Sequence, residues 1–131
     1  MIGIDTNVVV RYLTKDDPIQ STLAVKTIRS LTADEPGFIS LVTIAELTWV
    51  LETCYRFDKV ELVEVLGTLL ASQEVNLEQA ALVSQALRLF AAGSADFSDY
   101  LIEQSGHAAG CTHTFTFDQK AATSAGMRLL K

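Results

Sequence analysis

Short apolar segments alternate along this chain with longer segments in which apolar residues recur at helical spacing. Between residues 6 and 15, for example, Val9, Val10 and Leu13 fall on one side of a helix. The pattern predicts short strands at 1–5, 38–40, 74–77, 113–117 and 128–130, and helices at 6–15, from 18 onward, and at 41–55, 59–71, 78–92, 96–109 and 119–125. Strands that alternate with helices indicate βαβ units. We therefore predict an α/β fold whose parallel sheet is covered by helices on both faces.

The sequence makes more specific predictions for two of these helices, about the capping of one and the burial of both. Asp17 is expected to cap the second helix, with Pro18 at its first position. The apolar stripe of that helix is expected to consist of Leu23, Ala24, Ile28 and Leu31. The helix at 41–55 has almost no polar face, so we expect it to be buried.

Composition narrows the class of protein. A chain of 131 residues with 49% hydrophobic residues is expected to form one domain over 1–131, and it is too apolar to be disordered. The most apolar stretch, 60–71, is shorter than the roughly 20 residues of a membrane span. No signal-peptide pattern is visible at the N-terminus. The two cysteines, Cys54 and Cys111, are expected to be small buried hydrophobes in a reducing compartment, so we expect a cytoplasmic protein.

The charge balance is acidic, with 16 Asp and Glu against 10 Lys and Arg, which argues against a protein that holds nucleic acid by bulk positive charge. Five acids follow a predicted strand or lie near the start of a predicted helix: Asp5, Glu46, Asp96, Asp99 and Asp118. Taken singly, each is explained as a helix cap or a member of a capping box, because N-terminal amides attract carboxylates. Without these five, 11 acids remain against 10 bases.

Taken together, the same acids favour a metal site. The carboxyl ends of parallel strands meet at one edge of a sheet, so Asp5, Glu46, Asp99 and Asp118 are expected to share one small volume. Close carboxylates repel one another unless a cation offsets their charge. A set of oxygen ligands without His or Cys suits a hard ion, Mg²⁺ or Mn²⁺.

Four segments of the chain resemble the motifs of the PIN-domain nucleases, and most closely those of the VapC-type toxins of bacterial toxin–antitoxin pairs. They are Ile4-Asp5-Thr6-Asn7, the segment 40–47 around Glu46, the segment 95–102 around Asp96 and Asp99, and Thr116-Phe117-Asp118. Their order and spacing are those of the family, over essentially the whole chain. The resemblance implies a PIN-like three-layer α/β/α fold with a central parallel sheet of about five short strands. It also implies Mg²⁺-dependent endoribonuclease activity.

The resemblance implies roles for the acids. Asp5, Glu46, Asp99 and Asp118 would carry the activity. Of these, Asp5 and Asp99 are expected to be the main metal ligands, with Glu46 and Asp118 holding metal waters or a second ion and Asp96 in support. Thr6, Asn7 and Thr116 flank these acids and are candidates to hydrogen-bond carboxylates, metal waters or phosphate oxygens. Local capping is the alternative explanation for all three.

An RNA substrate needs cations for its backbone, and Arg11, Lys15 and Lys120 lie near the acidic motifs. Solvated helix faces explain these three equally well. The resemblance further implies a homodimer and a VapB-like antitoxin whose C-terminal segment lies in a hydrophobic groove and brings a basic side chain to the acids. Candidates for exposed apolar patches are Leu23, Ile28, Trp49, Leu51, Tyr55 and Phe57.

Other functions remain open at this point. A PIN nuclease could act in RNA maturation or on DNA without an antitoxin, and a non-catalytic acidic module could use the carboxylates only as caps or to bind metal. Haloacid-dehalogenase phosphatases resemble the start of the chain but have Asp-x-Asp where this chain has Asp5-Thr6-Asn7. A phospho-receiver domain needs paired acids after the first strand, and Asp5 is single.

Overall fold

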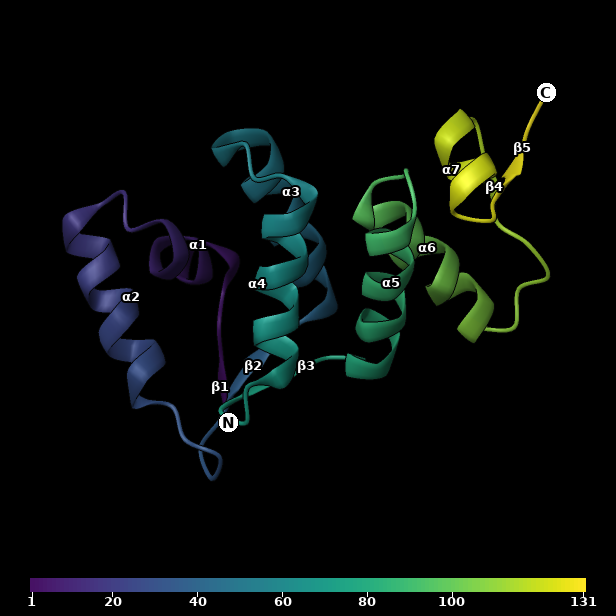
Figure 1. The fold of residues 1–131 in the computed structure, drawn as a ribbon. Helices are drawn as coiled ribbons and strands as arrows, with labels where there is room; N and C mark the ends of the chain where they lie inside the picture. Colours follow the sequence, from purple (N-terminus) through teal and green to yellow (C-terminus); the bar gives the residue numbers. More distant parts are fainter. The chain divides into compact units, whose positions relative to one another are not determined.

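The structure, a computed structural model, describes residues 1–131 and confirms the α/β fold (Figure 1). The elements in chain order are β1 (Ile2–Gly3), α1 (Thr6–Thr14), α2 (Pro18–Ser30), β2 (Gly37–Ile39), α3 (Leu41–Tyr55), α4 (Lys59–Ala71), β3 (Val75–Leu77), α5 (Ala80–Ala92), α6 (Phe97–Ala108), β4 (Phe115–Thr116), α7 (Gln119–Ser124) and β5 (Arg128–Leu129). No helix combines the length and the apolar character that crossing a membrane would require. The chain divides into two compact units, Met1–Ala80 and Ala81–Lys131, and the single domain expected over 1–131 stays a prediction.

The first unit is built on a parallel sheet of three strands in the order β1-β2-β3. The central strand β2 pairs Phe38 with Gly3 on one side and with Asn76 on the other. Helix α1 packs against α2 and α3, and α4 packs against β3. The fully buried side chains of this unit come from β2, α3 and α4: Ile39, Ile44, Leu47, Leu51, Leu62 and Leu66. The helices therefore supply most of the core, because each strand has only two or three residues.

The second unit contains α5, α6 and α7 with a parallel pair of strands, β4 and β5. An aromatic cluster joins α5 to α6: the ring centroids of Phe90 and Phe97 are 5.8 Å apart at 86°, and those of Phe90 and Tyr100 are 6.3 Å apart. The buried hydroxyl of Tyr100 accepts the N–H of Ala95 at 3.2 Å and lies 2.6 Å from the Ser124 hydroxyl. Tyr100 thus fixes the loop before α6 relative to α7.

Five short strands are present and every pairing is parallel, as expected. The expectation of one central sheet of about five strands is wrong, because the hydrogen bonds form one sheet of three strands and a separate sheet of two. Helices α3 and α4 have the predicted bounds. Asp17 caps α2 by accepting the N–H of Gln20 at 2.9 Å, with Pro18 at the first position, as expected. Helix α5 begins at Ala80 and not at Glu78, because the N–H of Glu78 donates to Ile39 of β2 and Gln79 has φ +55°.

Several expectations about burial are wrong. Ala24 and Leu31 are buried as predicted, but Leu23 is 60% exposed, which contradicts its place in the apolar stripe and fits its place among the candidates for an exposed patch. Leu51, another of those candidates, is fully buried. Helix α3 is not buried all round, because Val42 and Trp49 are 76% and 62% exposed. Both cysteines are exposed rather than buried. A helix of mixed apolar composition can turn only part of its circumference toward a sheet, so composition alone overestimates its burial.

Candidate active site

The two candidate acids of the first unit lie at the start of α1 and on α3. Asp5 follows β1 in extended conformation and caps α1, and its Oδ1 accepts the N–H of Thr6 at 2.8 Å. This capping role was one of the two explanations for Asp5, and it does not conflict with metal binding. A carboxylate has about four acceptor positions on its two oxygens, and the cap occupies one of them.

Thr6 connects the two acids of this unit. Its side chain is buried, and its hydroxyl donates a hydrogen bond to Oε1 of Glu46 on α3. One residue therefore binds Asp5 through its backbone N–H and Glu46 through its side chain. The capping-box explanation for Glu46 is wrong, because Ser40 caps α3 and its Oγ accepts the N–H of Thr43.

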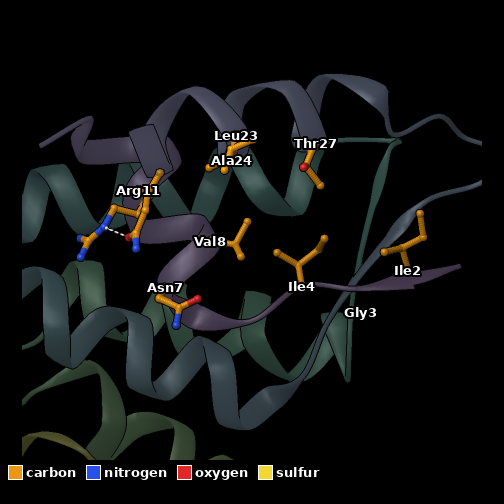
Figure 2. Close-up of a pocket in the computed structure, with 10 residues that line it drawn as sticks. Ile2, Gly3, Ile4, Asn7, Val8, Arg11, Leu23, Ala24 and Thr27 are labelled. Carbon is orange, nitrogen blue, oxygen red and sulfur yellow. Dashed lines mark hydrogen bonds between the residues drawn. The ribbon is translucent and has the colours of Figure 1, made fainter. Parts of the chain in front are cut away.

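Both acids line a cavity of about 510 Å³ between α1 and α3. Its polar lining consists of Asp5, Thr6, Asn7, Arg11, Glu46 and Tyr55, with Cys54 at the same wall. A second cavity, of about 330 Å³, lies between β1, α1 and α2 and is lined by apolar side chains such as Ile4, Val8 and Leu23 (Figure 2). No acidic residue lines this second cavity, and Asn7 and Arg11 line both. The first cavity is therefore the candidate for chemistry.

The acids of the second unit lie at the starts of α6 and α7. Asp96 stands at the N-cap position of α6, and its backbone N–H donates to Oδ2 of Asp99 at 3.2 Å. Asp118 caps α7 by accepting the N–H of Ala121 at 3.0 Å, and its own N–H donates to Oγ1 of Thr116 at 3.0 Å. These local bonds are those of the capping explanation.

The carboxyl of Asp99 is influenced by those of Asp96 and Asp118. Burial raises the pKa of the Asp99 carboxyl, and the charges of Asp96 and Asp118 raise it further. The hydrogen bond from the Asp96 backbone opposes this and lowers the pKa. Asp99 therefore lies in an acidic environment in which a cation would relieve both repulsion and desolvation.

The three candidate cations differ in their surroundings. Arg11 lines the cavity that contains Asp5 and Glu46. Lys15 is exposed with φ +53° at the C-terminus of α1, and it lines a shallow groove of α2 with Pro18. Lys120 is exposed on α7 in the second unit. Only Arg11 is placed beside an acidic candidate by a shared cavity.

Comparison with known protein families decides the identity. The family described as the PIN domain matches residues 2–126, which is nearly the whole chain. The chain belongs to the PIN-domain family. No curated protein matches the chain. PIN domains have a nuclease-type fold and are generally metal-dependent nucleases.

The residues of this PIN domain fit a divalent cation in donor chemistry. Its candidate ligands are all carboxylates, which suit a hard ion such as Mg²⁺. No group of three or more His, Cys, Asp and Glu side chains is placed to hold a metal ion, so neither unit alone supplies a complete ligand set. The meeting of Asp5, Glu46, Asp99 and Asp118 in one volume stays a prediction.

A hydrogen-bonded group next to the acidic cavity of the PIN domain was missed from the sequence. Arg11 donates to the side chains of Asp16, Gln20 and Tyr55. Tyr55 is 44 residues away from Arg11, so no local pattern could have linked them. The Asp16-Asp17-Pro18 sequence signalled only a helix start.

We expect Asp99→Asn to make the metal-free PIN domain more stable at pH 7. The pKa of Asp99 in the folded protein lies above its value in the unfolded chain. Between these two pKa values the folded state binds more protons than the unfolded state, so the stability of the fold falls as the pH rises from the lower pKa to the higher one. An amide carries no charge to desolvate and still accepts the N–H of Asp96. The gain in stability should therefore shrink as the pH falls below about 4, because the acid then becomes protonated in both the folded and the unfolded state. Thermal unfolding of the variant and the wild type in EDTA, at pH 7 and at pH 3, measures this difference in stability.

The matched control is Asp34→Asn, in the exposed loop before β2, which should change little at either pH. A gain for Asp99→Asn that persists at pH 3, or is absent at pH 7, would contradict the electrostatic explanation.

Proposed function

We propose that this PIN domain is a Mg²⁺-dependent endoribonuclease that hydrolyses phosphodiester bonds in RNA, with Mn²⁺ as an alternative ion. The observation that carries the proposal is the joint attachment of Asp5 and Glu46 to Thr6 at the wall of one cavity. Helix caps require no such pairing of residues 41 positions apart. The family match supports the nuclease class, and the RNA preference rests on the resemblance to the VapC-type toxins.

The ligands of the ion follow from the donor atoms. Asp5 and Asp99 would bind it directly, while Glu46 and Asp118 would hold its waters or a second ion and Asp96 would add negative charge. When bound, such an ion supplies a more acidic water and stabilises charge on a phosphoryl oxygen.

The chain itself supplies orientation. The Thr6 hydroxyl fixes one oxygen of Glu46, and the N–H of Thr6 fixes one oxygen of Asp5, so both carboxylates are oriented before any ligand binds. Asp118 is fixed in the same way by the N–H of Ala121. Preorganised carboxylates lose little freedom on binding, which favours both affinity and correct geometry. Asn7 and Thr116 stand beside these acids. Their side chains would donate to phosphate oxygens, and would donate to or accept from bound waters.

The direct test is cleavage by the purified protein. We expect single-stranded and looped RNA to be cut in Mg²⁺ and not in EDTA, with activity restored by added Mg²⁺ or Mn²⁺. A DNA oligonucleotide of the same sequence, assayed in parallel, tests the alternative substrate. Mapping the new RNA 5′ ends identifies the cleavage site. Cleavage that continues in EDTA, or cleavage of DNA alone, would contradict the proposal.

We further propose that the protein is the toxin of a toxin–antitoxin pair, acts in the cytoplasm, and forms a homodimer. The apolar cavity beside α2, with Leu23 exposed at its edge, offers a surface for an antitoxin segment (Figure 2). An antitoxin arginine near Asp5 and Glu46 would compete with the ion for the carboxylates.

Expression without the antitoxin should arrest growth, and co-expression with the product of a neighbouring short gene should relieve the arrest. A PIN nuclease of RNA maturation would show no such relief.

A further inference from the structure

The guanidinium of Arg11 is held by three side chains. Its Nε donates to Oε1 of Gln20 at 2.8 Å, and its Nη1 donates to the Tyr55 hydroxyl at 3.1 Å and to Oδ1 of Asp16 at 3.3 Å. The Tyr55 hydroxyl in turn donates to Oδ2 of Asp16 at 2.7 Å. Oδ1 of Asp16 also accepts from Thr14 at 2.9 Å. The guanidinium is therefore fixed from α2, from α3 and from the turn between α1 and α2.

The same bonds favour the charged form of Arg11 and leave two of its donors unused. The hydrogen bond to Tyr55 and the charge of Asp16 raise the pKa of Arg11, and the Tyr55 hydroxyl lowers the pKa of Asp16. An arginine carries five N–H donors, of which Nε and Nη1 account for three. The two donors of Nη2 make no hydrogen bond within the protein.

Arg11 is also the one basic residue that lines the cavity with Asp5 and Glu46. Two carboxylates at that wall repel a polyanion, so a substrate entering the cavity needs a cation beside them. A guanidinium matches a phosphate better than an ammonium does, because its planar donors bind two oxygens at once. The orientation of the Arg11 guanidinium then determines whether it can contact a phosphate in this way.

We propose that Arg11 is the receptor for a backbone phosphate of the RNA substrate, and that Asp16 and Tyr55 are positioning residues that orient its guanidinium at the cavity wall. This inference rests on the proposed ribonuclease function. The Asp16–Arg11 ion pair is partly exposed, so it contributes little to stability as a salt bridge. Its hydrogen bond restricts the orientation of the guanidinium.

The experiment measures binding of a single-stranded RNA oligomer in EDTA, where no cleavage is expected, over a range of salt concentrations. We expect Arg11→Gln to weaken RNA binding. It should also reduce the magnitude of the slope of the logarithm of the association constant against the logarithm of the salt concentration by about 0.7, which is the contribution of one phosphate contact on a single strand. Arg11→Lys should keep the slope and lose affinity. Tyr55→Phe keeps every charge, so it should keep the slope. It should weaken RNA binding by roughly threefold to tenfold, because it removes both hydrogen bonds of the Tyr55 hydroxyl, the one from Arg11 and the one to Asp16.

Arg29→Gln is the matched control, because it removes an exposed positive charge from α2 that does not line the acidic cavity. Its affinity and slope should equal those of the wild type, and thermal unfolding should verify that all variants fold. An unchanged slope in folded Arg11→Gln, wild-type affinity in Tyr55→Phe, or no wild-type binding at about 50 mM salt would overturn the inference.

A cleavage assay in Mg²⁺ separates this inference from the proposed function. If the wild type cuts RNA and the Arg11 and Tyr55 variants bind it normally, the phosphate receptor is wrong and the ribonuclease stands. If the slope depends on Arg11 but the wild type cuts nothing, the receptor stands and the ribonuclease is wrong. In the cleavage assay, Tyr55→Phe should raise KM and leave kcat nearly unchanged, which a general loss of structure would not do.

Discussion

Asp5→Asn should lower Mg²⁺-dependent RNA cleavage by more than about 100-fold, the upper range for residues that merely support a metal ligand. The substitution replaces one charged oxygen donor with a neutral amide nitrogen at the proposed metal ligand. It should leave the fold intact, because Asn caps a helix as well as Asp does, and its Oδ1 can still accept the N–H of Thr6. Cleavage rates and calorimetric Mg²⁺ titration of the same preparation measure both effects.

Asp17→Asn is the control, since Asp17 also caps a helix, in this case α2, and does not line the cavity with Glu46. It should cleave RNA at the wild-type rate. Asp5→Ala, by contrast, should cost about 1 kcal/mol of stability as well, because alanine cannot cap. Unchanged Mg²⁺ binding and unchanged cleavage in Asp5→Asn would remove Asp5 from the site.

Gly93→Ala should destabilise the second unit by about 2–3 kcal/mol, the upper part of the range for inserting a methyl group into a packed region. A Cβ at Gly93 would lie 1.8 Å from the Tyr100 hydroxyl and 2.8 Å from Oγ of Ser124. Tyr100 is 2% exposed and packs on Phe90, so its ring has no free space to enter. Urea unfolding followed by far-UV circular dichroism measures the change, and cleavage should fall with it because Asp96 and Asp99 follow this loop.

Gly67→Ala provides the opposite control. Gly67 lies inside α4, and a Cβ there would meet no atom within 4 Å apart from the backbone of its own helix and its chain neighbours. Alanine should therefore stabilise the protein by roughly 0.5–1 kcal/mol. The double variant Gly93→Ala, Tyr100→Phe should recover part of the loss, because it removes the oxygen that the new methyl group would meet. A neutral effect of Gly93→Ala would show that Tyr100 can move aside.

The fold features that could be predicted are those controlled by neighbouring residues. Helix α4 begins after Asp58, which forms a capping box with Glu61. Asp17 and Pro18 likewise fix the start of α2. Such signals depend on a few residues in sequence, so periodicity and capping rules recover them.

The candidate site depends on contacts that no local pattern contains. Thr6 and Glu46 are 40 residues apart, and their hydrogen bond exists only because α1 packs against α3. The acidic residues themselves were found from their places after strands and at helix starts. Their partners, and the exposure of Val42 and Trp49, required the packing of whole helices, which the apolar content of one helix does not specify.

The exposed position of Trp49 has a practical consequence. It is the chain's one tryptophan and belongs to the unit Met1–Ala80, so its fluorescence anisotropy reports on α3 and not on the unit that contains Tyr100. Circular dichroism sums the helices of both units. If tryptophan anisotropy and circular dichroism of the Gly93→Ala variant give the same unfolding midpoint, the protein unfolds as one cooperative domain. Different midpoints would measure how independently the two units unfold.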